Sequence, residues 1–206
     1  FLHYDKNHRW SFMDHFFNAD TSLDELYTGC FEDIGDLPNQ YYTRNIKNGD
    51  VDFYHSADIL QSQIEICKNV MLDDNKIKLK ISITNNGVKF VHIRYGCEFN
   101  ISLLGGHSFD RYYLVDGKKP VDSYLDSKDT FTAKTIALVT EWEKIKTSII
   151  LPKTTSVFRY PVETISMSEG GFERAYQSSV VVPNWELKLA PGDKFQTAIE
   201  LVTKEL

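Results

Sequence analysis

The side chains best suited to acid and base chemistry stand close together in RWSFMDHFF, residues 9–17. Asp14 and His15 could act as a proton-exchanging pair, and Arg9 could hold a carboxylate. However, neighbouring side chains point to opposite faces of a strand and diverge by about 100° around a helix, so Asp14 and His15 cannot easily share one proton. We therefore favour a structural role, in which Asp14 bonds to backbone N–H groups or to Arg9 and His15 packs among phenylalanines.

Two glycine-containing segments further along the chain could also bind a ligand. In SMSEGGFERAYQ, residues 166–177, Glu169 precedes two glycines that allow a tight turn. Its carboxylate could bind a sugar hydroxyl, or it could cap the turn or pair with Arg174. In GGH, residues 105–107, His107 could belong to a ligand loop or to an ordinary turn between strands. This glycine pair lacks the sequence context of a phosphate-binding loop.

The chain is rich in aromatic residues, with 11 tyrosines and 13 phenylalanines. Exposed aromatic faces can stack on sugar rings, so a tyrosine-rich face of a sheet is a plausible carbohydrate surface. Most aromatic side chains in strands nevertheless pack in the core. The tyrosines and tryptophans considered for a sugar-binding surface are Tyr41, Tyr42, Tyr54, Tyr112, Tyr113, Tyr124, Trp142 and Trp185.

Several functional classes are excluded or disfavoured by composition and by missing motifs. The net charge of -6 disfavours non-specific nucleic-acid binding. The sequence contains no run of 18 apolar residues, so no membrane span is predicted. The sequence has no nucleophile elbow, Walker loop or metal-spaced His/Cys cluster, so we expect no metal and no cofactor. Cys30, Cys67 and Cys97 are too scattered for a disulfide framework. We expect them to be reduced, buried thiols of an intracellular, cytoplasmic protein.

The first 40 residues are predicted to be irregular or helical. The segment SFMDHFF, residues 11–17, could form a short helix or a turn. A short helix is expected next, with Thr21 or Ser22 as its N-cap, acidic residues in its first turn and Gly29 as its stop signal.

Strands are predicted from residue 40 onward. Asn48-Gly49 is a strong hairpin signal, and residues 191–193 (Pro-Gly-Asp) form another turn. In residues 77–84, apolar and polar side chains alternate strictly, which predicts a strand with one solvated face. Many such strands without long helices between them predict an all-β protein, an antiparallel β-sandwich that spans residues 1–206 as a single domain.

Four segments, in order along nearly the whole chain, resemble the C-terminal domain of glycoside hydrolase family 57 enzymes. The members concerned are α-amylases and 4-α-glucanotransferases, which act on α-1,4-glucans. The segments are YDKNHRWSFMDHFF, IGDLPNQYY, YGCEFNISLLGGHS and VFRYPVETISMSEGGFERAYQSSVVVPNWELKL. The residues that match are Tyr4, Asp5, Arg9, Asp14, His15, Phe16, Gly96, Glu98, Asn100, Arg159, Pro161, Thr164, Ser166, Ser168, Glu169, Gly171, Phe172 and Gln177, whereas Leu37 stands where the family often has an aromatic residue.

This resemblance implies a fold and a division of labour. The fold is a β-sandwich like the galactose-mutarotase and glycosidase sugar-binding superfold, here with a short irregular-helical segment before it. The catalytic carboxylates of the family lie in an N-terminal (β/α) barrel, so this chain, which begins without Met, is expected to be an inactive part of a larger enzyme. The sandwich is then expected to leave an unpaired edge or an exposed apolar face at its N-terminal end.

The resemblance also implies partners and candidate residues. The partners are the catalytic barrel of the same enzyme, which would be a retaining one, and an α-glucan or maltooligosaccharide. No catalytic residue is expected in this chain. The candidates for substrate binding or for the domain interface are Arg9, Asp14, His15, Glu98, Asn100, His107, Arg159, Ser168, Glu169 and Gln177.

Two other functions remain open from the sequence. The chain could be a free-standing enzyme of the aldose-epimerase (mutarotase) type, with Glu169 as base and His107 as acid. It could also be a pure protein-interaction sandwich, which a concave face lined with aliphatic side chains would favour.

Overall fold

Strands make up most of the structure, as the sequence predicts. The computed structural model describes residue 5 and residues 7–47, 49–168 and 171–206. None of the helices in these residues is long and apolar enough to cross a membrane. The elements, in chain order, are β1 Met13–Phe17, α1 Leu23–Thr28, the 3-10 turn η1 Leu37–Asn39, β2 Thr43–Lys47, β3 Asp50–Ile59, β4 Ser62–Asp73, β5 Lys76–Asn85, β6 Val91–Ile101, β7 Arg111–Val115, β8 Asp129–Thr140, β9 Ile145–Ser168, β10 Gly171–Leu189 and β11 Lys194–Glu205.

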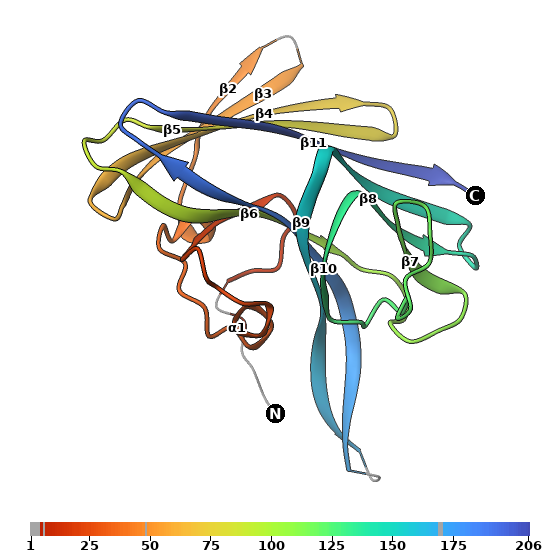
Figure 1. Ribbon diagram of the computed structural model, residues 1–206. Helices are drawn as coiled ribbons and strands as arrows, with labels where there is room; N and C mark the ends of the chain where they lie inside the picture. The colour runs from red at the N-terminus through yellow and green to blue at the C-terminus, as the bar shows by residue number, and fades with distance from the viewer. Residues whose placement is uncertain (1–4, 6, 48, 169–170) are drawn as a thin grey trace.

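The strands form two stacked layers that share β8 and β9 (Figure 1). The first layer has the order β1-β6-β10-β9-β8, and the second has the order β2-β3-β4-β5-β11-β9-β8-β7. The shared strands pass from one layer to the other: residues 156–168 of β9 pair with β10, whereas residues 145–150 pair with β11. All these pairings are antiparallel, so the predicted antiparallel β-sandwich is confirmed.

The main hydrophobic core lies between the two layers. Leu79, Ile81 and Ile83 of β5 are buried in it, whereas Lys80 between them is exposed. The predicted alternation of this strand is therefore confirmed. From the first layer, β6 contributes side chains that include Tyr95. Because each strand of an antiparallel sandwich buries every second residue, the remaining positions are available for an outer face.

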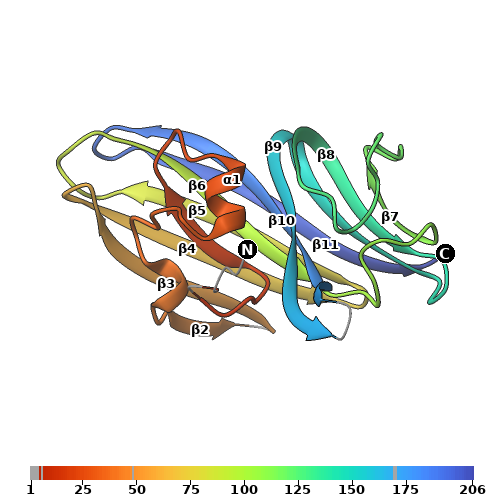
Figure 2. The same ribbon diagram turned by 90° about the horizontal axis from the view of Figure 1, so that it is seen from below.

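A second apolar cluster lies on the outer face of the first layer, under α1. Ser22 caps this helix and forms a capping box with Glu25, and Gly29 ends it in the left-handed conformation. Both ends agree with the prediction. Leu26 of α1 is buried against Phe17 and the outward residues of β9 and β10. Figure 2 views this face, with α1 in front of β6.

The prediction of a helix or turn for SFMDHFF is wrong, because Met13–Phe17 forms strand β1. β1 pairs antiparallel with β6 and all five of its residues are buried. One of its faces meets the main core and the other meets the cluster under α1. Because both faces of β1 are buried, its sequence shows no alternation of apolar and polar side chains that would distinguish a strand from a helix. β1 is also an edge of the first layer, although Ile34 N donates to Phe16 O on its open side.

Both turns predicted from the sequence connect strands of the sandwich, and two long paired strand ends project as an arm. The hairpin predicted at Asn48-Gly49 is confirmed by the pairing of β2 with β3, although Asn48 itself lies outside the described residues. The turn at residues 191–193 is also confirmed, with Gly192 at a φ of 85°. Residues 162–168 of β9 and 171–178 of β10, the paired ends of these strands, form a hairpin arm that projects beyond the layers (Figure 1).

The cysteines and the selected aromatic residues divide between core and surface. Cys97 is buried, as predicted, whereas Cys30 is exposed, so the prediction of three buried thiols is wrong; all three cysteines are free. Tyr113 and Trp185 are buried in the main core. Tyr41, by contrast, is exposed. The expectation of core packing therefore holds for only part of the aromatic set.

Gly96 permits the close packing of β6 against its neighbours. A Cβ built on Gly96 would lie 2.8 Å from Phe17 Cε2 and 2.9 Å from Val182 Cγ1. Replacing Gly96 with alanine is therefore expected to lower the free energy of unfolding by about 1–3 kcal/mol through overpacking. Thermal unfolding measures this as a loss of about 2–4 °C per kcal/mol. Gly105→Ala is the matched control because its Cβ would have only an ordinary contact at 3.7 Å; an equal loss in both variants would contradict the packing explanation.

Candidate functional site

Four of the candidate residues from the sequence meet on the outer face of the first layer. His15 lies on β1, Glu98 and Asn100 lie on β6, and Arg9 precedes β1. The register explains the meeting. Met13 pairs with Glu98, and His15 pairs with Gly96, two residues before Glu98 on β6, so His15 and Glu98 point to the same side. Asp14 points to the opposite side, as the geometric argument from the sequence requires.

His15 bridges two carboxylates, and its surroundings supply further hydrogen bonds. His15 Nδ1 lies 2.7 Å from Asp33 Oδ2, and His15 Nε2 lies 3.4 Å from Glu98 Oε2. Asn100 Nδ2 donates to Glu98 Oε1 at 2.6 Å, and Arg9 Nη1 lies 3.5 Å from the same oxygen. We call these five side chains, Arg9, His15, Asp33, Glu98 and Asn100, the outer ionic cluster.

The electrostatics of the outer ionic cluster favour a protonated His15 and an ionised Glu98 over a proton that moves between them. Burial by itself lowers the pKa of His15, but the hydrogen bonds and negative charges of Asp33 and Glu98 outweigh it and raise this pKa to about 9. For Glu98, burial by itself raises the pKa, but His15 and Arg9 outweigh it and hold this pKa below its usual value. A histidine that stays protonated at neutral pH is poorly placed to act as a general base.

Aromatic side chains enclose His15. Its ring stacks on Phe17 with centroids 5.4 Å apart and meets the edge of Phe31 at 5.9 Å. The prediction that His15 packs among phenylalanines is therefore confirmed. Tyr160 also contacts the outer ionic cluster, because its hydroxyl accepts from Arg9 Nη1 at 3.2 Å. Sequence reasoning missed Asp33 and Tyr160, since neither stands in a motif with the residues that it contacts.

Asp14 forms a separate buried site inside the main core, so its predicted pairing with backbone N–H groups or with Arg9 is wrong. Lys68 Nζ on β4 lies 2.6 Å from Asp14 Oδ2. Tyr42 donates to Asp14 Oδ2 at 2.7 Å, and Tyr95 donates to Asp14 Oδ1 at 2.6 Å. Asp14 and Tyr95 belong to the first layer and Lys68 to the second, so this ion pair joins the two layers. The sequence contained one overlooked signal for this site. Side chains alternate along a strand, and Lys68 lies an even number of residues from Ile64, so it shares the buried face of β4.

An open groove adjoins the outer ionic cluster. A small cavity of about 20 Å³, enough for one water molecule, lies between Arg9, His15 and Glu98. On the other side of Arg9 lies a groove of about 580 Å³, between the segment that precedes β1 and the base of the arm. Gln177 lines this groove on the arm and donates to Thr164 Oγ1 at 3.1 Å.

The remaining candidates do not join this site. Arg159 is fully buried in the interior, where its guanidinium lies over the ring of Tyr113 at 4.6 Å and donates to a backbone carbonyl. His107 is exposed on a loop and stacks on Tyr124, with its centroid 3.8 Å away. Glu169 lies outside the described residues, and of Ser168 only the backbone, at the end of β9, is described. Within the described part of the chain, no group of three or more His, Cys, Asp or Glu side chains could hold a metal ion.

Comparison with known proteins identifies related sequences over almost the whole chain. The model of the family described as "Alpha-amylase/4-alpha-glucanotransferase, C-terminal" matches residues 1–199. The chain is 27% identical to Alpha-amylase 1 of Dictyoglomus thermophilum over 98% of its own length and 29% of that protein. It is 20% identical to the 4-alpha-glucanotransferase of Thermococcus kodakarensis over 84% of its length and 23% of that protein. The chain thus spans about a quarter of the length of these relatives.

Solved structures show the same fold. The 4-alpha-glucanotransferase of Thermococcus litoralis matches 100% of this chain with 29% of its own, at a TM-score of 0.81 and 19% identity. A putative aldose 1-epimerase from Escherichia coli K12 matches 84% of this chain with 71% of its own, at a TM-score of 0.58 and 12% identity. The expected relation to the galactose-mutarotase superfold is therefore confirmed at the level of the fold.

Proposed function

The chain belongs to the family of C-terminal domains of α-amylases and 4-α-glucanotransferases, and from this premise we propose that it is the non-catalytic β-sandwich of an enzyme acting on α-1,4-glucans. In this proposal, residues 1–206 form one domain, which docks on the (β/α) barrel of the same retaining enzyme and lines part of its glucan cleft. A cytoplasmic location is part of the proposal and is supported by three cysteines that form no disulfide.

One observation supports the non-catalytic role: the motif residues that meet on the outer face of the first layer form ion pairs and hydrogen bonds with one another. His15 lies between Asp33 and Glu98. Glu98 also accepts a hydrogen bond from Asn100 and forms an ion pair with Arg9. Side chains that are buried in mutual ion pairs hold segments together and are not available to a substrate. The outer ionic cluster therefore joins the N-terminal segment, β1, β6 and the loop after α1.

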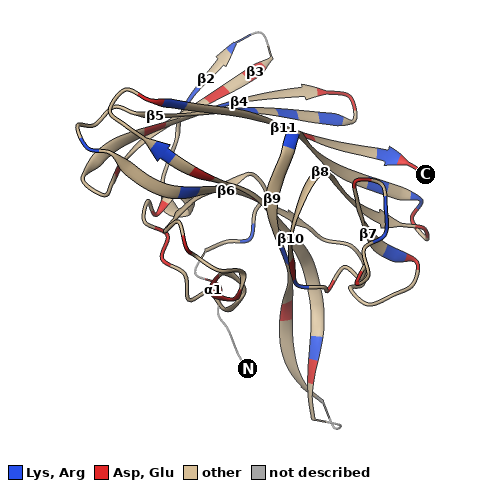
Figure 3. Cartoon of the chain, viewed as in Figure 1, with Lys and Arg blue, Asp and Glu red and all other residues tan. Residues whose placement is uncertain are grey.

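The same face supports the docking part of the proposal. Asp5 and residues 7–9 line one side of the open groove, and Val162, Thr164 and Gln177 at the base of the arm line the other. A catalytic region that precedes residue 5 would therefore emerge beside the arm. Figure 3 shows the arm extending beyond the layers with charged residues of both signs.

The end of the arm is suited to burial against a partner. Met167 of β9 lies directly opposite Phe172 of β10 in the register, and these side chains are 80% and 82% exposed. Exposed apolar side chains on a projecting hairpin, rimmed by polar residues, are typical of a protein contact. We assign this pair to the contact with the barrel.

Replacing Phe172 with serine in the 206-residue chain is expected to weaken docking. Loss of a buried aromatic anchor should raise the dissociation constant between this chain and a separately produced catalytic barrel about tenfold. Isothermal titration calorimetry measures the constant directly. Phe90→Ser is the matched control, because Phe90 is also exposed but stands before β6, away from the arm.

Two results would contradict the proposal. Equal affinities for the Phe172→Ser and wild-type chains would remove the arm from the interface. Hydrolysis of maltoheptaose by this chain alone would remove the non-catalytic role, since the residues of the outer ionic cluster would then have to be reconsidered as catalytic groups.

A further inference from the structure

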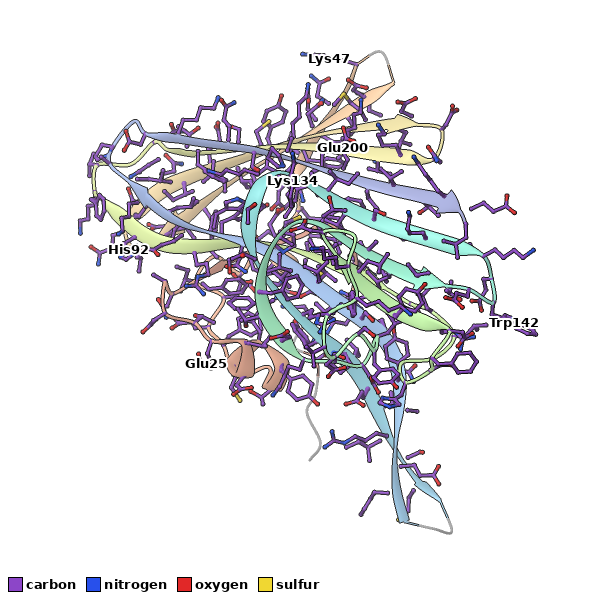
Figure 4. The ribbon with its side chains drawn as sticks, turned by 45° about the vertical axis from the view of Figure 1, so that its right-hand side comes forward. Glu25, Lys47, His92, Lys134, Trp142 and Glu200 are labelled. Atoms are coloured by element: carbon purple, nitrogen blue, oxygen red, sulfur yellow. The ribbon has the colours of Figure 1, made fainter. Side chains whose placement is uncertain are left out.

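A second groove lies on the outer face of the second layer, across β3, β4, β5 and β11. It encloses about 700 Å³ and is lined by side chains that include Tyr54, Cys67, Ser82 and Gln196. These residues alternate with the core residues of the same strands, so they belong to the solvent side of the sheet. Figure 4 shows Glu200 of β11 and Glu25 of α1 on opposite sides of the molecule. The groove therefore faces away from the outer ionic cluster.

The strand register explains why this face is hollowed. Tyr54 lies opposite Cys67, Cys67 opposite Ser82, and Ser82 opposite Gln196, so the four form one row across the sheet. The two middle side chains are small and the two end side chains are large. Three strand spacings separate the ends, a length of roughly 14 Å. Such a trough accepts a short linear chain better than a single small molecule.

The groups beside this row suit a ligand that carries hydroxyls and no charge. Lys80 and Asn69 flank the row on one side, and Lys194 and Glu65 flank it on the other. Asp52, which accepts from Asn69 Nδ2 at 2.8 Å, brings the charges to two positive and two negative. Balanced charges with many donors and acceptors do not select an ion, but they can hydrogen-bond a polyhydroxyl ligand.

An exposed aromatic side chain points to a ligand rather than to a merely solvated sheet. Tyr54 is 37% exposed at one end of the row, and its ring offers an apolar face on which a sugar ring can stack. At the other end, the exposed amide of Gln196 can both donate to and accept from sugar hydroxyls.

From this arrangement we propose that the groove is a second saccharide site, which binds a stretch of α-glucan chain away from the catalytic region. The choice of α-glucan rests on the proposed function. Because the arm and the groove lie on opposite layers, docking on the barrel leaves the groove open. The site would hold the enzyme on a polymeric substrate while the catalytic cleft acts elsewhere on it.

Titration of the 206-residue chain with maltoheptaose tests the site. Tyr54→Ala is expected to raise the dissociation constant at least tenfold, because the stacking platform is lost. Tyr41→Ala is the matched control and should leave the constant unchanged, since Tyr41 is 97% exposed and does not line the groove. Ser82→Trp, which fills the middle of the row, should abolish binding. Circular dichroism and thermal unfolding confirm that each variant is folded.

The outcomes separate this inference from the proposed function. Absence of heat up to millimolar maltoheptaose, or equal affinity of Tyr54→Ala and the wild type, would overturn the second site and leave docking untouched. Phe172→Ser should weaken docking and keep maltoheptaose binding. Loss of maltoheptaose binding through Gln177→Ala but not through Tyr54→Ala would place the saccharide on the other face and would also refute the second site.

Discussion

Replacing Asp14 with alanine is expected to lower the free energy of unfolding by about 3–5 kcal/mol. Asp14 is 3% exposed, and its carboxylate receives Lys68 Nζ, Tyr42 OH and Tyr95 OH within 2.7 Å. Without it, a buried ammonium group and two buried hydroxyls lose their partner, and the desolvation of Lys68 is no longer offset. Urea unfolding of the 206-residue chain measures the change.

Two further variants show whether the buried ion pair is the cause. Asp58→Ala removes an exposed carboxylate from β3 and should change stability by less than about 0.5 kcal/mol. The double variant Asp14→Ala/Lys68→Met should recover part of the loss, because no unpaired charge then remains in the core. A loss below 1 kcal/mol for Asp14→Ala, or no recovery in the double variant, would show that the ion pair does not hold the layers together.

The outer ionic cluster should make stability depend on pH above neutrality. The pKa of His15 is about 9 in the folded chain, against 6.5 for an unperturbed histidine side chain. A folded-state pKa above the unfolded value contributes stability that is fully present below pH 6.5 and is lost as the pH rises through about 9. The difference corresponds to about 3 kcal/mol. Glu98, whose pKa is held low, acts in the opposite direction, so its contribution is present above pH 4.5 and is lost in acid.

The expected result is therefore a stability maximum between about pH 5 and pH 6.5 and a decline between pH 6.5 and pH 9. His15→Gln should flatten this decline. His107→Gln is the matched control, since the side chain of His107 is 67% exposed, and it should keep the wild-type profile. Chemical unfolding at half-unit pH steps gives the three curves. If His15→Gln declined as steeply as the wild type, the cluster would not be the origin of the effect.

Strand alternation and helix-capping signals correctly predicted the elements that have one buried face or exposed ends. β5 alternates because one of its faces is buried and the other meets solvent, and α1 begins at Ser22 and ends at Gly29 because its terminal backbone groups need caps. β1 was mistaken for a helix or turn because both of its faces are buried, which removes the alternation.

The site was harder to predict than the fold, because its contacts join segments that are distant in sequence. The motif residues His15 and Glu98 indeed meet, yet nothing near them in the sequence indicates that Asp33 completes the pair. The partner of Asp14 lies on β4 in the opposite layer. The alternation of β4 indicates that Lys68 is buried, but it does not indicate which carboxylate pairs with Lys68.

The place of β11 in the sheet has a consequence for biosynthesis. β11 follows the other described strands in sequence, yet it lies between β5 and β9 in the interior of the second layer. The meander from β2 to β5 can pair with itself early, since its connections are short. The nascent polypeptide, however, must keep an unpaired edge on both β5 and β9 until Lys194–Glu205 leaves the ribosome. During translation, these two edges are where the growing chain is most open to pairing with a neighbour and most dependent on chaperones.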